Sequence, residues 1–182
     1  MKETALNDPD RFGGLRVVEG CSLRKARNMK MRKAERRYYV AYGSNLNIRQ
    51  MMARCPRAIA VGRTEIRDYE LLFKGRRGSA YLTIEPKVGG TVPAAVWSTT
   101  AEDEARLDRY EGFPTCYYKK ELAVEVDGRK LTAYVYIMHE ERPVEIPAWT
   151  YVEICLQGCR DFELDGKHML RALERSREVC GR

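Results

Sequence analysis

One short loop of the sequence has the composition of an anion-binding site. An aromatic, β-branched run ends in Tyr42-Gly43-Ser44-Asn45-Leu46, and a helix-forming stretch follows it. Where a strand gives way to a helix, backbone N–H groups converge at the positive end of the helix dipole, and such a concavity holds carboxylates and other anions. Gly43 permits close backbone approach, and Ser44 and Asn45 add hydrogen-bonding side chains. An ordinary helix cap uses the same residue types, so the loop alone leaves both interpretations open.

Glu111 is a second candidate for chemistry because of where its helix should end. The partial negative charge at a helix C-terminus disfavours an ionised carboxylate. Tyr110, Phe113 and Pro114 would provide apolar surroundings, which raise the pKa of a carboxyl group in the same direction. Both effects favour a general base or acid that titrates near neutral pH. The alternative is a solvated glutamate on a charged helix.

The cysteines give little support to metal or redox chemistry. We expect free thiols in a reducing compartment, mostly buried as small apolar groups. Cys155 and Cys159 are four residues apart, but neither His139 nor His168 has metal-ligand spacing to this pair. We therefore expect no metal site and no other cofactor. Cys116 lies near Glu111 in the sequence, but no neighbouring histidine is available to activate it as a nucleophile.

The elements that must position these residues are mostly strands. Aromatic and β-branched runs predict strands at 37–42, 58–67, 69–74, 80–85 and 91–98, and alternation about Asp127-Gly128 predicts a hairpin of 117–126 with 129–138. Helices are expected at 47–54, 99–111, 148–157 and 167–178. Thr99 and Glu102 have capping-box spacing. Gly112 and Gly158 are placed to end their helices.

Strands first, with helices inserted and appended, indicate the α+β class. We expect a mixed, partly closed, barrel-like β-sheet with flanking helices. The 182 residues suffice for one domain. Residues 1–36 are predicted to be a basic N-terminal extension, and 37–182 the folded domain. Residues 1–37 contain 11 Lys and Arg against 5 Asp and Glu, and so carry almost all of the net charge of +7.

Hydropathy and charge also restrict location and partners. No apolar run reaches the length of a membrane span and the first residues lack a secretory signal, so we expect a cytoplasmic protein without a membrane partner. The domain is nearly neutral, whereas a nucleic-acid enzyme would spread positive charge along its working face. We therefore expect no nucleic-acid partner for it. The basic extension could bind an acidic partner or nucleic acid, or pack on the domain or on a second subunit of a homodimer.

The two motifs together resemble a known family. The loop from Tyr42 to Leu46, followed by Leu107-Asp108-Arg109-Tyr110-Glu111-Gly112, is similar to the γ-glutamylcyclotransferases, which include AIG2-like proteins. Tyr117 follows at a similar position. The strand at 134–138 and the helix that begins at Trp149-Thr150-Tyr151 also resemble that family. The resemblance extends from about Arg37 to Glu174.

This resemblance implies a small-molecule γ-glutamyl substrate that is converted to 5-oxoproline and a free amine or amino acid, without a cofactor. By position, Glu111 is similar to the catalytic glutamate of the family. The positions similar to its substrate-binding residues are Tyr42, Gly43, Ser44, Asn45, Leu46, Tyr117 and Tyr151. The Gly-Ser-Asn-Leu loop favours free γ-glutamyl amino acids, although the compact segment 112–116 leaves the departing group open. The alternative function is a small-ligand-binding or interaction module on the same fold.

Overall fold

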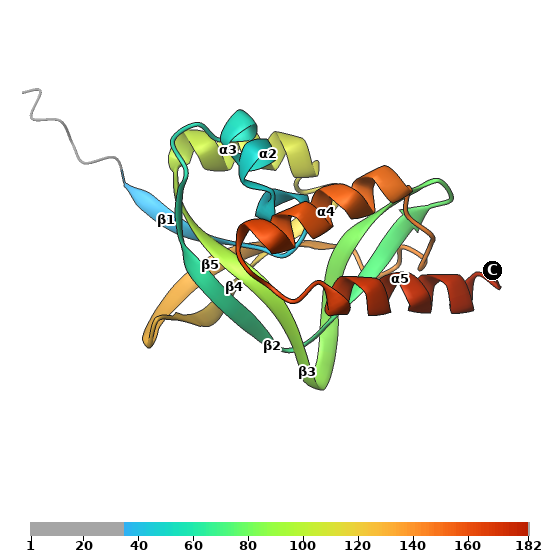
Figure 1. Cartoon of the computed structure of the whole chain (residues 1–182). Helices are drawn as coiled ribbons and strands as arrows, with labels where there is room; N and C mark the ends of the chain where they lie inside the picture. The colour runs from blue at the N-terminus through green and yellow to red at the C-terminus, as the bar shows by residue number, and fades with distance from the viewer. Residues whose placement is uncertain (1–34, 182) are drawn as a thin grey trace, which may run out of the picture. The chain divides into compact units, whose positions relative to one another are not determined.

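The computed structural model describes residues 35–181 as a mixed sheet with flanking helices (Figure 1). The predicted extension at 1–36 therefore lies almost entirely outside the described residues. The strands are β1 (Arg36–Ala41), β2 (Ile59–Arg76), β3 (Ser79–Thr100), β4 (Tyr117–Val126) and β5 (Arg129–Met138). Their order in the sheet is β2-β3-β1-β5-β4. β1 runs parallel to β5, and all other neighbours are antiparallel. The predicted α+β class is thus confirmed.

The long strands β2 and β3 replace four shorter predicted strands. β2 continues through two register shifts, one between Ala60 and Gly62 and one between Arg67 and Tyr69. Asp68, inside the second shift, has a φ of 61°. A bulge of this kind bends a strand and changes its alternation without ending its pairing. The break in the hydrophobic pattern therefore marks a bend in one strand and not a boundary between two.

The sheet bends toward a barrel but does not close. Its two edge strands, β2 and β4, approach each other without a backbone ladder between them in the described part of the chain. One side-chain bond crosses the opening, from Thr64 Oγ1 to the Glu125 carbonyl at 2.8 Å. A cleft of about 650 Å³ follows this opening. The strand pattern predicted a mixed, partly closed, barrel-like sheet. The structure confirms the mixed sheet with flanking helices, and this sheet is not closed.

The helices are α2 (Ile48–Arg54), α3 (Ala101–Glu111), α4 (Trp149–Asp161) and α5 (Lys167–Val179), with a 3-10 turn η1 (Ser44–Leu46) after β1. None of the described helices has both the length and the apolar character needed to cross a bilayer. The capping box of α3 uses Thr100 and Asp103, one residue later than predicted. Thr99 still belongs to β3, and its hydroxyl donates to the Arg37 carbonyl at 3.1 Å. Gly112 ends α3 in the left-handed conformation (φ 66°), as predicted.

Gly158 does not end its helix, contrary to the sequence prediction. It is buried inside α4, which continues to Asp161. A Cβ atom at this position would lie 2.5 Å from the Asn47 nitrogen and 2.5 Å from the Leu46 Cβ. The glycine therefore permits α4 to approach the backbone after η1, because any larger residue would collide with it.

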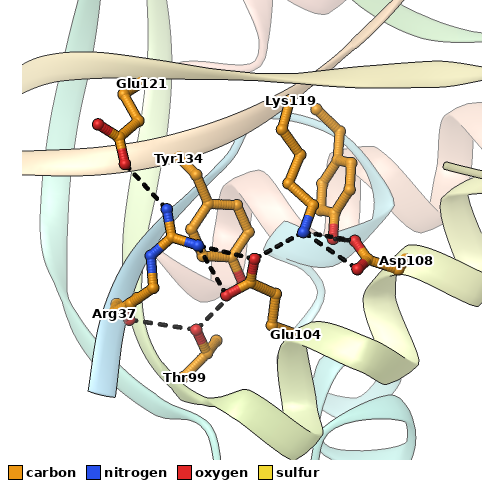
Figure 2. A network of polar contacts seen from close by, with 8 residues as sticks. Arg37, Thr99, Glu104, Asp108, Lys119, Glu121 and Tyr134 are labelled. Carbon is orange, nitrogen blue, oxygen red and sulfur yellow. Dashed lines mark hydrogen bonds and ion pairs between the residues drawn. The ribbon is translucent and has the colours of Figure 1, made fainter. Parts of the chain in front are cut away.

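A partly buried charge network holds α3 against the sheet (Figure 2). Arg37 of β1 forms an ion pair with Glu104 of α3 at 2.8 Å. Lys119 of β4 bridges Glu104 and Asp108, with N–O distances of 2.6 and 2.8 Å. Because these bonds tie one helix to two strands, they fix the orientation of the helix whose last residue is Glu111.

Candidate functional site

The carboxylate of Glu111 faces the loop between β1 and α2. The Asn45 side chain donates from Nδ2 to Oε1 of Glu111 at 2.8 Å, and also to the Tyr39 hydroxyl at 2.8 Å. The Asn45 carbonyl accepts a hydrogen bond of 3.1 Å from the indole of Trp97, a buried core residue. The structure thus brings together the two motifs that the sequence analysis selected separately, and the core fixes their contact.

Arg54 is a further member of this site, and the sequence analysis missed it. Its guanidinium donates to Asn45 Oδ1 at 2.6 Å, to Ser44 Oγ at 3.2 Å and to the Tyr110 hydroxyl at 2.7 Å. It also lies 3.8 Å from the centre of the Tyr110 ring. An arginine in the last turn of a helix is ordinarily interpreted as compensation of the helix dipole. One feature of the sequence could have indicated this contact, namely that the predicted helix is short. The last side chain of a helix as short as α2 can reach back to the loop that precedes it.

The pKa of Glu111 lies in the range that proton transfer requires. Burial raises this pKa from its ordinary 4.5 to about 7, against the opposing effects of the Arg54 cation and the Asn45 hydrogen bond. The direction of the shift agrees with the sequence prediction, and so does desolvation as its main cause. Of the neighbours in sequence that were expected to provide apolar surroundings, Tyr110 and Phe113 are 49% and 38% exposed, and Tyr110 lines the same cavity as Glu111.

Glu111 lies between a wide outer cavity and a narrow inner recess. The outer cavity has a volume of about 570 Å³, which is in the range of roughly 300–1,000 Å³ found for small-molecule sites. The inner recess measures about 30 Å³ and has room for one water-sized group. Ser44, Glu111, Tyr117 and Tyr151 line both spaces. A bound molecule in the outer cavity could therefore place one polar group into the recess beside the carboxylate.

Most of the predicted substrate-binding residues line this recess. They are Tyr42, Gly43, Ser44, Asn45, Tyr117 and Tyr151. Leu46 lines neither space, since its side chain is 1% exposed and lies in the core beside Gly158 of α4. The structure therefore places Leu46 in the core and not in the wall of the cavity or the recess. The apolar side chain of Leu46 anchors the loop to the core beside α4.

Three tyrosine hydroxyls of the recess form hydrogen bonds with backbone groups. Tyr117 donates to the Leu82 carbonyl at 3.1 Å, and the Leu82 N–H donates to the Tyr151 hydroxyl at 3.2 Å. Tyr42 donates to the Tyr136 carbonyl at 2.6 Å. Leu82 lies outside the segment of β3 that pairs with β1. The tyrosines therefore satisfy backbone groups that a neighbouring strand would otherwise bond, and they support the cavity wall.

Removing the Tyr151 hydroxyl should weaken the fold. We expect Tyr151→Phe to lower the free energy of unfolding by about 1–3 kcal/mol, because the Leu82 N–H would lose its acceptor. Chemical denaturation measures this change. The matched control is Tyr81→Phe, since Tyr81 is 46% exposed and the one hydrogen bond of its hydroxyl among the described residues is with Ser79 Oγ at 3.3 Å. Equal stability of the two variants would contradict the structural role of Tyr151.

The described cysteines differ in their surroundings. Burial raises the pKa of the Cys155 thiol to about 12 and that of Cys159 to about 11, so both are protonated packing groups. Cys116 lines the outer cavity, and His139 lies opposite it across the β4–β5 hairpin, which the sequence analysis did not anticipate. The His139 ring contacts the Pro114 carbonyl at 2.8 Å. Within residues 35–181, no cluster of three or more His, Cys, Asp or Glu side chains could hold a metal ion.

Known proteins resemble this chain in both sequence and fold. The family model described as gamma-glutamyl cyclotransferase, AIG2-like, matches residues 39–153. Human gamma-glutamylcyclotransferase is 27% identical over 152 residues, which cover 75% of this chain and 78% of the human protein. The mouse protein is 27% identical over 149 residues, with the same shares covered. A solved structure named gamma-glutamyl cyclotransferase superimposes with a TM-score of 0.69 at 24% identity, over 76% of this chain and 86% of that chain. The region matched by the family model contains both Asn45 and Glu111.

Proposed function

Because the chain belongs to the gamma-glutamyl cyclotransferase, AIG2-like family, we propose that it converts a γ-glutamyl amino acid or amine to 5-oxoproline and a free amine. The observation that carries the proposal is the hydrogen bond of 2.8 Å between Asn45 and Glu111 at the boundary of the cavity and its recess. It joins the loop that was predicted to bind anions to a carboxyl group whose pKa is raised to about 7. A group with that pKa can both accept and return a proton at neutral pH.

The proposed reaction is an intramolecular aminolysis. The α-ammonium group of the glutamyl unit first loses a proton, and its nitrogen then attacks the γ-carbonyl carbon. A C–N bond forms to close the five-membered lactam, and the attacking nitrogen loses a second proton. The bond from the carbonyl carbon to the departing nitrogen breaks, and the departing nitrogen takes up both protons and leaves as an ammonium group. Glu111 would take the first proton as a base and return it as an acid. General acid–base catalysis of this kind contributes roughly 10²–10⁴ to the rate.

Asn45 is proposed to orient the catalytic carboxylate. Its Nδ2 holds Oε1 of Glu111, and Arg54 holds its Oδ1 at 2.6 Å, so the amide cannot rotate freely. Oε2 of Glu111 has no protein hydrogen-bond partner within residues 35–181. We therefore assign the proton transfer to Oε2.

The loop backbone is proposed to bind the developing negative charge of the substrate. The N–H groups of Leu46 and Asn47 donate within the turn, at 2.9 and 3.1 Å. Those of Ser44 and Asn45 have no protein acceptor in the part of the chain that the structure describes, and both residues line the recess. One well-placed oxyanion donor is typically worth about 3–4 kcal/mol in the transition state. Holding the substrate in a folded, attacking geometry can add about 7–11 kcal/mol.

A panel of γ-glutamyl amino acids and γ-glutamyl amines tests the proposal. We expect 5-oxoproline and the free amine to form in equal amounts, without added metal or nucleotide. Calorimetric binding of the same compounds should be measured in parallel. Binding without any 5-oxoproline would favour the alternative function, a ligand-binding module that uses the same cavity.

A further inference from the structure

The outer cavity is lined by an excess of positive charge. Arg76, Arg109 and Arg142 contribute to its wall, and Glu111 is the one acid among the described residues that line it. The three arginines, which we call the arginine rim, come from the end of β2, from α3, and from the connection between β5 and α4. None of them lines the inner recess. The charge of these three arginines is therefore confined to the part of the cavity outside the recess.

The arginine rim has no acidic partners of its own. Within residues 35–181, none of its three guanidinium groups forms an ion pair or a side-chain hydrogen bond, whereas Arg37 and Arg57 each pair with a glutamate. Arg142 is only partly exposed, and among the described residues it bonds through its backbone N–H, which donates to the His139 carbonyl. A single unpaired surface arginine is common. Three around one cavity create a positive potential that attracts anions.

We infer that the enzyme prefers γ-glutamyl compounds whose departing amine carries two carboxylates, and that the arginine rim determines this preference. The inference rests on the proposed function. If Glu111 and the recess hold the reacting end of the substrate, the remaining volume of the outer cavity receives the departing group. The arginine rim would contact that group there. Guanidinium groups bind carboxylates through paired, charge-assisted hydrogen bonds.

The competing explanation is that an arginine binds the α-carboxylate of the glutamyl unit. That carboxylate is present in every γ-glutamyl substrate, so such a contact would aid all of them equally. Contacts to the departing group would instead change the ratio of the kcat/KM values of substrates that differ in this group. The two explanations are therefore distinguished by relative turnover and not by overall activity.

Three substrates measure this ratio: γ-glutamyl-glutamate, γ-glutamyl-glutamine and γ-glutamyl-n-butylamine. Their departing groups carry two, one and no carboxylates, and glutamate and glutamine are matched in size. We expect kcat/KM for γ-glutamyl-glutamate to exceed that for γ-glutamyl-glutamine by about tenfold, the effect of one charge-assisted hydrogen bond at a partly solvated site. The difference should lie mainly in KM, and it should shrink as salt screens the charges.

The variants Arg76→Gln, Arg109→Gln, Arg142→Gln and their triple combination test the assignment. The triple variant should bring the glutamate-to-glutamine ratio close to one. Arg129→Gln is the control, because Arg129 is exposed at the far end of the β4–β5 hairpin, and it should leave the ratio unchanged.

Two results would overturn the inference and leave the proposed function standing. One is equal kcat/KM for glutamate and glutamine substrates in the wild type, with 5-oxoproline formed from both. The other is an equal loss for all three substrates in the triple variant, which would assign the arginines to the glutamyl unit. If no substrate yields 5-oxoproline, the proposed function fails, and the inference that depends on it fails too.

Discussion

Glu111→Gln should keep the fold and lose 5-oxoproline formation by roughly 10²–10⁴-fold in kcat, because an amide cannot accept and return the proton. Glutamine preserves the shape of the side chain, and its oxygen can still accept the hydrogen bond from Asn45. The variant therefore removes the proton-transfer group without removing the framework around it. Product release measures the loss, and near-ultraviolet circular dichroism measures whether the packing is retained.

Glu102→Gln is the control for this experiment. Glu102 lies in the first turn of the same helix, where it pairs with Arg57 and Arg106 at the surface. Its substitution should leave turnover close to that of the wild type. If Glu111→Gln also turned over at nearly the wild-type rate, proton transfer would have to be assigned to another group.

The raised pKa of Glu111 also predicts how activity depends on pH. The carboxylate must be ionised to act as a base, so kcat/KM should rise as the pH increases through about 7. Burial is the main cause of the raised pKa, which means that ionisation is unfavourable in the folded protein. A profile with its acidic limb near the ordinary value of 4.5 would contradict this assignment.

The same shift should make the free energy of unfolding fall as the pH rises. In the window between 4.5 and about 7, the folded state binds more protons at Glu111 than the unfolded state does. Stability is lost across this window, by up to about 3 kcal/mol, and the loss is complete above it. The glutamine of the variant Glu111→Gln does not titrate, so the variant lacks this loss. The free energy of unfolding of the variant minus that of the wild type should therefore increase from low to high pH. Denaturant unfolding at a series of pH values measures this difference.

Gly158→Ala should destabilise the protein and impair catalysis, although alanine is the better helix former. In an open helix the change would stabilise by about 0.5–1 kcal/mol. Here the new Cβ would lie 2.5 Å from the Asn47 nitrogen and 2.5 Å from the Leu46 Cβ. Overpacking of this kind costs about 1–3 kcal/mol, so we expect a net loss in the free energy of unfolding. Because Leu46 anchors the loop, its shift should also displace Asn45 and reduce kcat/KM by about 10²-fold.

Gln157→Ala is the matched control, since Gln157 is the exposed neighbour of Gly158 on the same helix. It should change stability by only a few tenths of a kcal/mol, as exposed helix positions usually do, and should leave kcat unaffected. A Gly158→Ala protein that is more stable than the wild type and fully active would show that α4 and the loop can separate without consequence.

The sequence alone determined those elements whose signals are local. The hairpin of β4 and β5 was predicted at its observed bounds, because alternation and the Asp127-Gly128 turn lie within one short segment. The end of α3 at Glu111 was also predicted, because Gly112 adopts the left-handed conformation that the prediction required. The family resemblance also selected the loop and the glutamate as the residues of interest.

Only the tertiary structure decided how these residues meet. Asn45 and Glu111 are 66 positions apart in the sequence and share a hydrogen bond because the sheet and the charge network on α3 hold them together. The contact of Arg54 with the loop, the burial of Leu46 and the role of Gly158 in close helix approach likewise depend on neighbours distant in the chain. Desolvation of a carboxylate is a property of everything that surrounds it. For that reason the residues adjacent in sequence indicated the direction of the pKa shift and desolvation as a cause, whereas the surrounding fold determines how deeply the carboxyl group is buried.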